Sequence, residues 1–215
     1  MLAPPSDRTE PDRNCPLCPR LAAFREAARK REANWFNSPV PSFGDPNGRL
    51  LIVGLAPGLQ GANRTGRPFT GDFAGDLLYT TMIEYGFAKG IYQARPDDGL
   101  QLVDCLISNA VRCVPPQNKP LPIEISNCRP FLTATIEAMP RLRAILTLGR
   151  VAHESTIKAL GQRGSLAPFA HGAIHQAGRL KLYDSYHCSR YNTNTGVLTA
   201  TMFHAVFAKI RADLG

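Results

Sequence analysis

Short runs of apolar residues alternate with longer amphipathic stretches along most of the chain. The run 50–53 is short, continuous and apolar, as is typical of a strand buried on both faces of a sheet, and three further segments predict strands: 102–108, 144–148 and 180–186. The intervening stretches predict helices over 19–34, 73–87, 123–139, 151–160 and 198–214. This alternation predicts a three-layer α/β/α sandwich around a central four-stranded parallel sheet, with a functional site at the carboxyl ends of the strands.

The length and composition of the chain indicate one domain. With 215 residues, of which 44% are apolar, the chain can bury a full core. Residues 1–14 are rich in proline and charge and predict a disordered tail, which leaves 15–215 as the single domain. No run approaches the ~20 apolar residues of a membrane helix, and the polar opening does not resemble a signal peptide. We therefore expect a soluble, cytoplasmic monomer without membrane contact.

The chain is basic, with 25 Lys and Arg against 17 Asp and Glu and a formal net charge of +8. Such a charge attracts polyanions, and duplex DNA carries one negative charge per ~1.7 Å of its axis. The charge therefore favours a nucleic-acid partner. An ordinary basic protein can have the same composition, so charge alone does not decide the question.

Six cysteines in a chain without a secretion signal do not indicate a disulfide framework, because the cytosol keeps thiols reduced. Four of them form two pairs that suit metal ligation, namely Cys15 with Cys18 in a CxxC and Cys113 with Cys128. Zinc and a [4Fe–4S] cluster both accept four cysteine thiolates, so the spacing does not choose between them. Buried structural thiols are the remaining alternative, which suits Cys105 within its apolar strand.

Three segments at predicted strand ends are too specific for generic loops. The first reads GLAPG at 54–58 and GANRTGRPFTGD at 61–72, the second reads NAVRCVPP at 109–116, and the third reads HCSRYNTNTG at 187–196. Together they resemble the motifs of uracil-DNA glycosylases, and the full pattern is similar to family 5, the UDGb type. Leu55 stands where family 4 has a carboxylate. The resemblance therefore implies that the catalytic carboxylate lies elsewhere.

This resemblance implies an enzyme that flips a damaged base out of DNA and hydrolyses its bond to the sugar. Uracil is the expected substrate, with hypoxanthine and xanthine as further deaminated bases, in double- or single-stranded DNA. We expect a monofunctional enzyme that has no lyase lysine and leaves an abasic site. Two alternatives are a metal-stapled DNA-binding protein without catalysis and a phosphate-binding α/β enzyme, although the chain lacks the GK[ST] ending of a P-loop.

Three side chains are candidates for the chemistry. Asp72 closes the TGD triplet and can orient water and stabilise a cationic sugar, although Asp76 is a rival and Asp72 can instead cap a helix. Asn109 offers a donor and an acceptor to the polar edge of uracil, unless it serves only as a turn residue. His187 can donate a hydrogen bond to the base carbonyl on which charge develops, unless its role is structural. Cys188 replaces the proline that usually follows this histidine, which leaves the rigidity of the loop open.

The base and the DNA backbone have candidates of their own. Phe69 can stack on the flipped base, with a core phenylalanine as the alternative. Small residues of the first motif allow the backbone to approach the base closely, namely Gly54, Ala56, Pro57 and Gly58. Arg190 and Tyr191 follow the motif histidine and are expected to hold the duplex open. Phosphate contacts are expected from Ser189, Arg64, Arg67 and Lys119, the last three of which also suit a solvated basic face.

The resemblance also implies the metal group, which the spacing of the cysteines leaves open. The family holds a [4Fe–4S] cluster on four cysteines arranged as Cys15, Cys18, Cys113 and Cys128 are. We expect this cluster to be structural, because the substrate chemistry is hydrolytic. It would pin the N-terminal segment and the 113–128 loop to the core.

Overall fold

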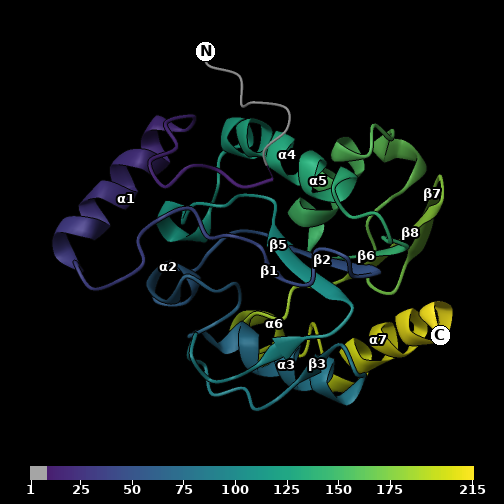
Figure 1. Cartoon of the computed structure of the whole chain (residues 1–215). Coiled ribbons are helices and arrows are strands. Elements are labelled where there is room, and N and C mark those ends of the chain that lie inside the picture. Colours follow the sequence, from purple (N-terminus) through teal and green to yellow (C-terminus); the bar gives the residue numbers. More distant parts are fainter. Residues whose placement is uncertain (1–8) are drawn as a thin grey trace.

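The fold is built around one six-stranded sheet. The structure is a computed structural model that describes residues 9–215. Across the sheet the strands follow the order β1-β5-β2-β6-β8-β7 (Figure 1). Their bounds are β1 Phe43–Gly44, β2 Leu50–Gly54, β5 Cys105–Asn109, β6 Ala144–Leu148, β7 Ile174–Ala177 and β8 Leu180–Ser185. A separate two-stranded ribbon pairs β3 (Ala88–Lys89) with β4 (Gln101–Leu102).

Helices cover both faces of the sheet. Their bounds are α1 Pro19–Arg31, α2 Ala62–Thr65, α3 Phe73–Glu84, α4 Pro122–Glu137, α5 Arg150–Ala159, α6 Arg190–Asn194 and α7 Ala200–Leu214. Short 3-10 turns lie at Pro116–Asn118 and Gly164–Leu166. In Figure 1, α4 and α5 lie above the sheet, and α3 and α7 lie below it. The predicted three-layer α/β/α sandwich is therefore confirmed.

The four central strands, β5, β2, β6 and β8, are parallel to one another, as the continuous apolar runs predicted. Ile52 of β2 is aligned with Ile107 of β5 and with Leu146 of β6. Successive side chains point to opposite faces, so Leu50 packs on the side of α3 and α7 while Leu51 packs on the side of α4 and α5. Because both faces are covered, β2 and β6 are apolar at nearly every position, whereas β5 and β8 become polar toward their carboxyl ends.

The two edge strands were not predicted, so the sheet has six strands where the sequence indicated four. β1 runs antiparallel to β5, and β7 runs antiparallel to β8. β1 has only two residues, and β7 reads IHQA, so neither forms a continuous apolar run. The predicted strand over 102–108 begins only at Cys105, because Asp104 adopts a positive φ of 55° that separates β5 from β4.

The segment that precedes α1 contacts the domain. Residues 9–14, which the sequence assigned to a tail, include Glu10, whose carboxylate accepts a hydrogen bond from Arg112 Nη1 at 2.9 Å. The same carboxylate accepts a hydrogen bond from the backbone N–H of Ser42 at 3.0 Å. Residues 1–8 of that predicted tail lie outside the described residues.

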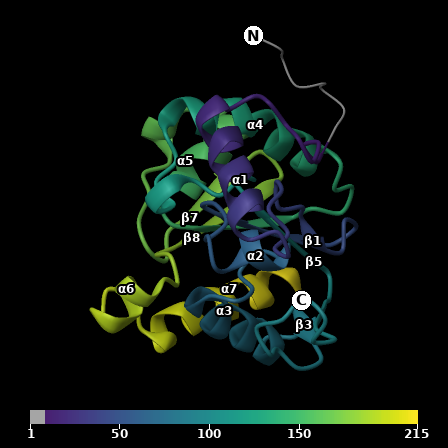
Figure 2. The same cartoon turned by 90° about the vertical axis from the view of Figure 1, so that its left-hand side faces the viewer.

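α1 packs beside the layer that contains α4, as Figure 2 shows with α1 facing the viewer. Its Leu21 belongs to the same apolar cluster as Phe131 of α4. α1 ends at Arg31, three residues before the predicted end at 34. Over residues 9–215, no helix is both long and apolar enough to cross a membrane.

Candidate active site

A pocket of about 800 Å³ opens at the carboxyl ends of β2, β6 and β8. Its walls come from the loops that follow these strands and from the first turns of α3 and α5. In a parallel sheet, this is the end at which ligands bind. Seven residues that the sequence singled out line the pocket: Ala56, Gly58, Asp72, His187, Ser189, Arg190 and Tyr191.

Phe69 and Asn109 meet at Gly54, the last residue of β2. A Cβ on Gly54 would come within 2.4 Å of Asn109 Oδ1 and 2.6 Å of Phe69 Cζ, so only glycine leaves room for both side chains. Both side chains are buried, and neither lines the open pocket. The Phe69 ring nevertheless lies 5.9 Å, centroid to centroid, from the ring of His187, which does line it. The structure thus brings Phe69, Asn109 and His187 to one place.

His187 follows β8 and is partly buried in the pocket wall. Its backbone carbonyl accepts a hydrogen bond from Asn192 Nδ2 at 2.8 Å, which fastens the loop to α6. Cys188, in place of the usual proline, is fully buried in the core and anchors the loop by packing. Burial lowers the pKa of the His187 imidazole to about 4, because the charged form would lose its hydration. At neutral pH the ring is therefore uncharged and has one N–H to donate.

Asp72 immediately precedes α3; its side chain makes no close capping hydrogen bond, although the backbone N–H groups of Ala74 and Gly75 in the first turn lie near enough to lower the pKa of the carboxyl group against the larger effect of burial. Its Oδ1 is buried and has no hydrogen-bond partner among residues 9–215. Its Oδ2 lies against Gly58 and Gly61, where an added Cβ would come within 2.9 and 2.2 Å of the oxygen. Burial raises the pKa of this carboxyl group. The rival, Asp76, is exposed and does not line the pocket, so the geometry favours Asp72.

The short helix α6 holds the candidates for DNA contact at the edge of the pocket. Tyr191 is 74% exposed, which is unusual for a large aromatic side chain. The guanidinium carbon of Arg190 lies 5.3 Å from the ring centroid of Phe73, at the start of α3. Ser189 Oγ accepts a hydrogen bond from Asn192 N at 3.4 Å and caps α6, while its hydroxyl can still donate to an acceptor. An exposed ring, a cation and a hydroxyl therefore lie side by side.

Arg67 is buried, and the expected phosphate contact of this residue is wrong. Its guanidinium makes two hydrogen bonds to the carboxylate of Asp98, from Nη1 at 2.8 Å and from Nη2 at 2.7 Å. A guanidinium engaged in this bidentate way has no open edge for a phosphate. The sequence did not reveal the pairing, because Asp98 is 31 residues further along the chain.

Arg64 and Lys119 are exposed, but neither lines the main pocket. Arg64 Nε donates a hydrogen bond to the carbonyl of Gln60 at 2.8 Å, and its side chain borders a different hollow beside Trp35. Asn118, next to Lys119, does line the main pocket. For these two basic residues the phosphate contact stays a prediction.

The four candidate ligand cysteines line one small cavity beside apolar residues at the junction of α1 and α4: Cys15, Cys18, Cys113 and Cys128. Three N–H groups point at their sulfurs, one of them from Asn127 Nδ2, which donates to Cys18 Sγ at 3.9 Å. The backbone N–H of Arg112 donates to Cys128 Sγ at 3.3 Å, and Arg25 Nη1 donates to Cys113 Sγ at 3.3 Å. Hydrogen bonds of this kind orient thiolate ligands and tune the metal group that they hold. The donor set and its surroundings therefore fit a metal or cluster site.

Zinc and a [4Fe–4S] cluster both accept four cysteine thiolates, so this donor set fits either group. A second group of three potential ligand atoms among residues 9–215, all within 4.8 Å of one another, consists of His153, His175 and Asp184.

The His153 group is a hydrogen-bonded ion pair. Nδ1 of His153 lies 2.8 Å from Asp184 Oδ1, and Nε2 lies 2.8 Å from the carbonyl of Ala167. Burial alone would lower the pKa of this imidazole, but the hydrogen bonds to Asp184 and Ala167 raise it above its usual value. Both ring nitrogens face acceptors, an arrangement that favours the charged form of His153, in which neither nitrogen offers a lone pair to a metal.

Some pocket residues were missed at the level of sequence. Gly149 and Arg150, at the start of α5, line the pocket because β6 ends directly before them. The rule that sites lie at strand ends could have found these two. The sequence around Phe169 gave no such signal, because this residue does not directly follow a strand. It reaches the pocket from the loop before β7, where the guanidinium carbon of Arg150 lies 5.3 Å from its ring centroid.

Known proteins resemble this chain over most of its length. A family model described as the uracil DNA glycosylase superfamily matches residues 41–214. A type-5 uracil-DNA glycosylase of Thermus thermophilus is 45% identical over 208 residues, which cover 94% of each chain. A type-5 uracil-DNA glycosylase of Pyrobaculum aerophilum is 39% identical over 206 residues, which cover 94% of this chain and 90% of the relative. A type-4 uracil-DNA glycosylase of the same organism is 30% identical over 169 residues, or 78% of this chain and 71% of the relative.

The chain therefore belongs to the uracil DNA glycosylase superfamily, and within it to the type-5 family. This confirms the resemblance that the three motifs carried. The family match runs from before β1 into α7, so it includes every strand of the sheet and every wall of the pocket.

Proposed function

We propose that this chain is a DNA-repair glycosylase that hydrolyses the bond between uracil and its deoxyribose in DNA and leaves an abasic site. The observation that carries the proposal is the convergence of Asp72, His187 and the Phe69–Asn109 pair at the carboxyl end of the sheet. The printed names of the relatives and the net charge of +8 support it.

In this proposal the flipped base is bound by Phe69 and Asn109. A base outside the helix has an exposed π-face and a free polar edge, and the two side chains match these features. The ring of Phe69 offers a surface for stacking, and the Asn109 amide offers both an acceptor and a donor to the edge of uracil. Gly54 supports this arrangement, because its missing side chain allows both residues to reach the same place.

His187 is proposed to help the base to leave. When the glycosidic bond breaks, negative charge develops on a carbonyl oxygen of uracil, and a donated hydrogen bond stabilises it. The lowered pKa of His187 means that the donor is a neutral imidazole. A neutral imidazole stabilises the charge that develops on the base by donating a hydrogen bond. It carries no permanent charge of its own that would have to be buried when the pocket is empty.

Asp72 is proposed to orient the attacking water and to stabilise positive charge on the sugar. Asp72 lines the pocket, so its carboxylate can accept a hydrogen bond from a water bound there. The raised pKa of this carboxyl group makes its ionised form a stronger base than an exposed aspartate. Asp76 is exposed and does not line the pocket.

The exposed residues of α6 are proposed to hold the duplex open after the base has flipped. Tyr191 can fill the space left in the base stack, and Arg190 and Ser189 can bind the phosphates on either side. Unstacking a base costs a few kcal/mol, which such contacts offset. Arg64 and Lys119 are proposed as outer phosphate contacts, since both are exposed.

We also propose that the enzyme is monofunctional and accepts several deaminated bases, including hypoxanthine and xanthine. None of the described residues that line the pocket is a lysine, so the pocket offers no amine for a Schiff base with the sugar. The resemblance of the three motifs to family 5 implies this breadth.

A [4Fe–4S] cluster is proposed on the four cysteines at the junction of α1 and α4. When bound, it would cross-link the segment before α1 to the loop after β5, and would supply stability rather than reaction chemistry. The N–H groups of Arg112 and Arg25 would hydrogen-bond its cysteine ligands. Ala56 of the first motif packs against the same apolar cluster, so a bound cluster would stabilise one wall of the pocket.

The function is tested with a labelled duplex that contains one uracil, beside a matched duplex with thymine. Release of free uracil, measured by mass spectrometry, and strand cleavage only after alkali are expected for the uracil duplex alone. Duplexes with hypoxanthine or xanthine test the breadth, and borohydride trapping tests for a lyase step. Tight binding of the uracil duplex without release of uracil would instead indicate a DNA-binding protein that lacks catalysis.

A further inference from the structure

The backbone around Phe69 is held by side-chain hydroxyls. The carbonyls of residues 68, 69 and 70 accept hydrogen bonds from Tyr79 Oη at 2.6 Å, Tyr92 Oη at 3.1 Å and Thr65 Oγ1 at 3.0 Å, respectively. Phe69 itself has a φ of 51°, a left-handed conformation that is unfavourable for a bulky residue. Such a conformation persists only where the surrounding structure fixes it. Residues in such conformations cluster at functional sites.

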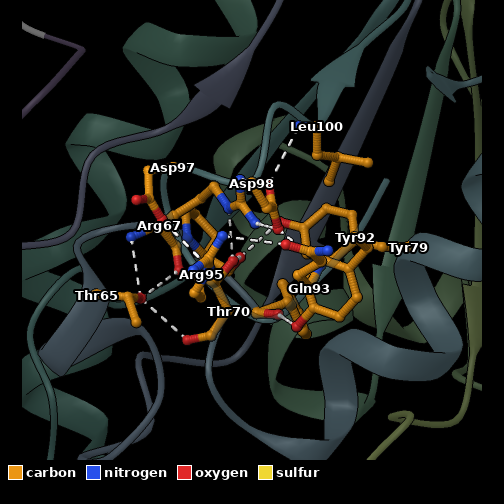
Figure 3. A network of polar contacts seen from close by, with 12 residues as sticks. Thr65, Arg67, Thr70, Tyr79, Tyr92, Gln93, Arg95, Asp97, Asp98 and Leu100 are labelled. Carbon is orange, nitrogen blue, oxygen red and sulfur yellow. Dashed lines mark hydrogen bonds and ion pairs between the residues drawn. The ribbon is translucent and has the colours of Figure 1, made fainter. Parts of the chain in front are cut away.

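The buried ion pair between Arg67 and Asp98 fixes the segment from which Tyr92 comes (Figure 3). The Asp98 carboxylate accepts four hydrogen bonds: two from Arg67, one from Gln93 N at 3.0 Å and one from Leu100 N at 3.1 Å. The Asp98 side chain is fully buried. Arg67 Nε also donates to Thr70 Oγ1 at 2.7 Å, so one guanidinium joins the loop of residues 93–100 to the Phe69 turn.

Aromatic contacts complete this network. The rings of Tyr79 and Tyr92 lie 4.7 Å apart, centroid to centroid, and the guanidinium carbon of Arg67 lies within 6 Å of both ring centroids. Burial raises the pKa of Tyr92 to about 12, so its hydroxyl stays protonated and remains a donor. Tyr92 thus keeps its hydrogen bond to the Phe69 carbonyl at neutral pH.

Gly75 shows how closely Tyr92 and Phe69 fit together. This glycine lies in the first turn of α3, where a Cβ would come within 1.9 Å of the Phe69 carbonyl oxygen and 2.2 Å of Tyr92 Oη. The hydrogen bond between Tyr92 and Phe69 therefore occupies space that any other residue at position 75 would fill. α3 also begins next to Asp72, so one helix start borders both groups.

We propose that Tyr92, held by the Arg67–Asp98 pair, is a positioning residue that fixes the Phe69 ring for stacking on the flipped base. This inference rests on the proposed function, in which Phe69 contacts the base. Tyr92 acts only on the backbone of Phe69, and neither Tyr92 nor Asp98 lines the pocket. Without the Tyr92 hydroxyl, the Phe69 carbonyl loses its donor and the ring becomes free to leave the orientation that faces His187.

The test is the Tyr92→Phe variant, which removes one hydroxyl and keeps the ring. Binding is measured to a duplex with uncleavable 2′-fluoro-2′-deoxyuridine and to a matched duplex with an abasic analogue, which has no base to stack. We expect the affinity for the fluorouridine duplex to fall about threefold to tenfold, the range of one lost hydrogen bond, and the affinity for the abasic duplex to stay unchanged. Asp98→Asn should also lower the affinity for the fluorouridine duplex, because it weakens the contacts that hold the segment next to Tyr92.

A double-mutant cycle with Phe69→Ala shows whether Tyr92 acts through Phe69. In the Phe69→Ala background, Tyr92→Phe should have no further effect on binding. The control is Tyr183→Phe, which also removes a buried tyrosine hydroxyl, the one bonded to Asp213, far from the pocket. It should alter the melting temperature without changing the ratio of the two affinities.

Equal losses on both duplexes, or an undiminished loss in the Phe69→Ala background, would overturn the inference. The same preparation of wild type is assayed for uracil release, which tests the proposed function separately. Uracil release by wild type together with an unchanged Tyr92→Phe affinity ratio would contradict the positioning role alone. Failure of wild type to release uracil would contradict the proposed function on which the role rests.

Discussion

The carboxylate of Asp72 lies directly against the α-carbon of Gly61. A Cβ on Gly61 would come within 2.2 Å of Asp72 Oδ2 and 2.8 Å of its Cγ, distances that no real pair of atoms adopts. The first motif therefore provides a space, lined by glycine, that holds the carboxylate at the pocket. This explains why the GLAPG segment at 54–58, which contains no reactive side chain, lies beside the proposed catalytic carboxylate.

Gly61→Ala should displace the Asp72 carboxylate and lower the rate of uracil excision at least tenfold. The matched control is Gly164→Ala, because a Cβ at Gly164 meets no atom within 4 Å. Single-turnover rates of both variants, compared with wild type, measure the effect. If Gly61→Ala excised uracil at the wild-type rate, the contact would have no part in placing Asp72.

His187 should remain uncharged down to a pH near its lowered pKa of about 4, whereas an exposed histidine has a pKa near 6.5. Between these two values the unfolded chain binds a proton at this residue and the folded chain does not. The free energy of unfolding should therefore rise with pH across this window and become independent of His187 above it. An NMR titration of the imidazole nitrogens checks the pKa, and His187→Gln should remove this contribution to the pH dependence. A midpoint near 6.5 in the folded protein would contradict the account.

Asp98→Asn should lower the free energy of unfolding by about 3–5 kcal/mol, because it leaves the Arg67 guanidinium buried without its counter-charge. The neighbouring Asp97→Asn is the control. Asp97 Oδ1 lies 3.6 Å from Arg95 Nε, and both side chains are largely exposed. Surface pairs of that kind contribute about 0–1 kcal/mol. Urea denaturation of both variants measures the difference. Equal losses for Asp97→Asn and Asp98→Asn would show that Arg67 is solvated rather than buried.

Cys113→Ser should abolish the brown colour and most of the bound iron that we expect of the purified protein. It should also lower the melting temperature, because the cluster would no longer join the segment before α1 to the loop after β5. Cys105→Ser is the control, since Cys105 is buried in β5 and does not line the cavity of the four cysteines. A colourless wild type that contains zinc would refute the iron assignment.

The sequence predicted the central strands and most of the pocket because both leave local signals. Runs such as 50–53 are apolar throughout, since the strand is covered on both faces. Asp72 closes the first motif and His187 opens the third; both motifs come after strands, and parallel strands bring their carboxyl ends together. The family resemblance then supplied roles that periodicity alone could not.

Features that depend on distant partners were beyond the sequence. Arg67 had the appearance of a surface cation, because nothing near it in the chain indicates that Asp98 folds back onto it. The edge strand β1 has two residues and pairs only because β5 offers it an open edge. Phe169 reaches the pocket through a loop with no periodic pattern. In each case, long-range packing rather than local preference determined the position.

The central claim is that Asp72 serves the chemistry and not merely the fold. It is tested most directly by the rate of uracil excision by Asp72→Asn and Asp76→Asn, measured beside their affinity for the same duplex with 2′-fluoro-2′-deoxyuridine. Asp72→Asn should lose about 10²-fold to 10⁴-fold in rate with little loss of affinity, while Asp76→Asn stays close to wild type. A large loss for Asp76→Asn together with a wild-type rate for Asp72→Asn would contradict the account.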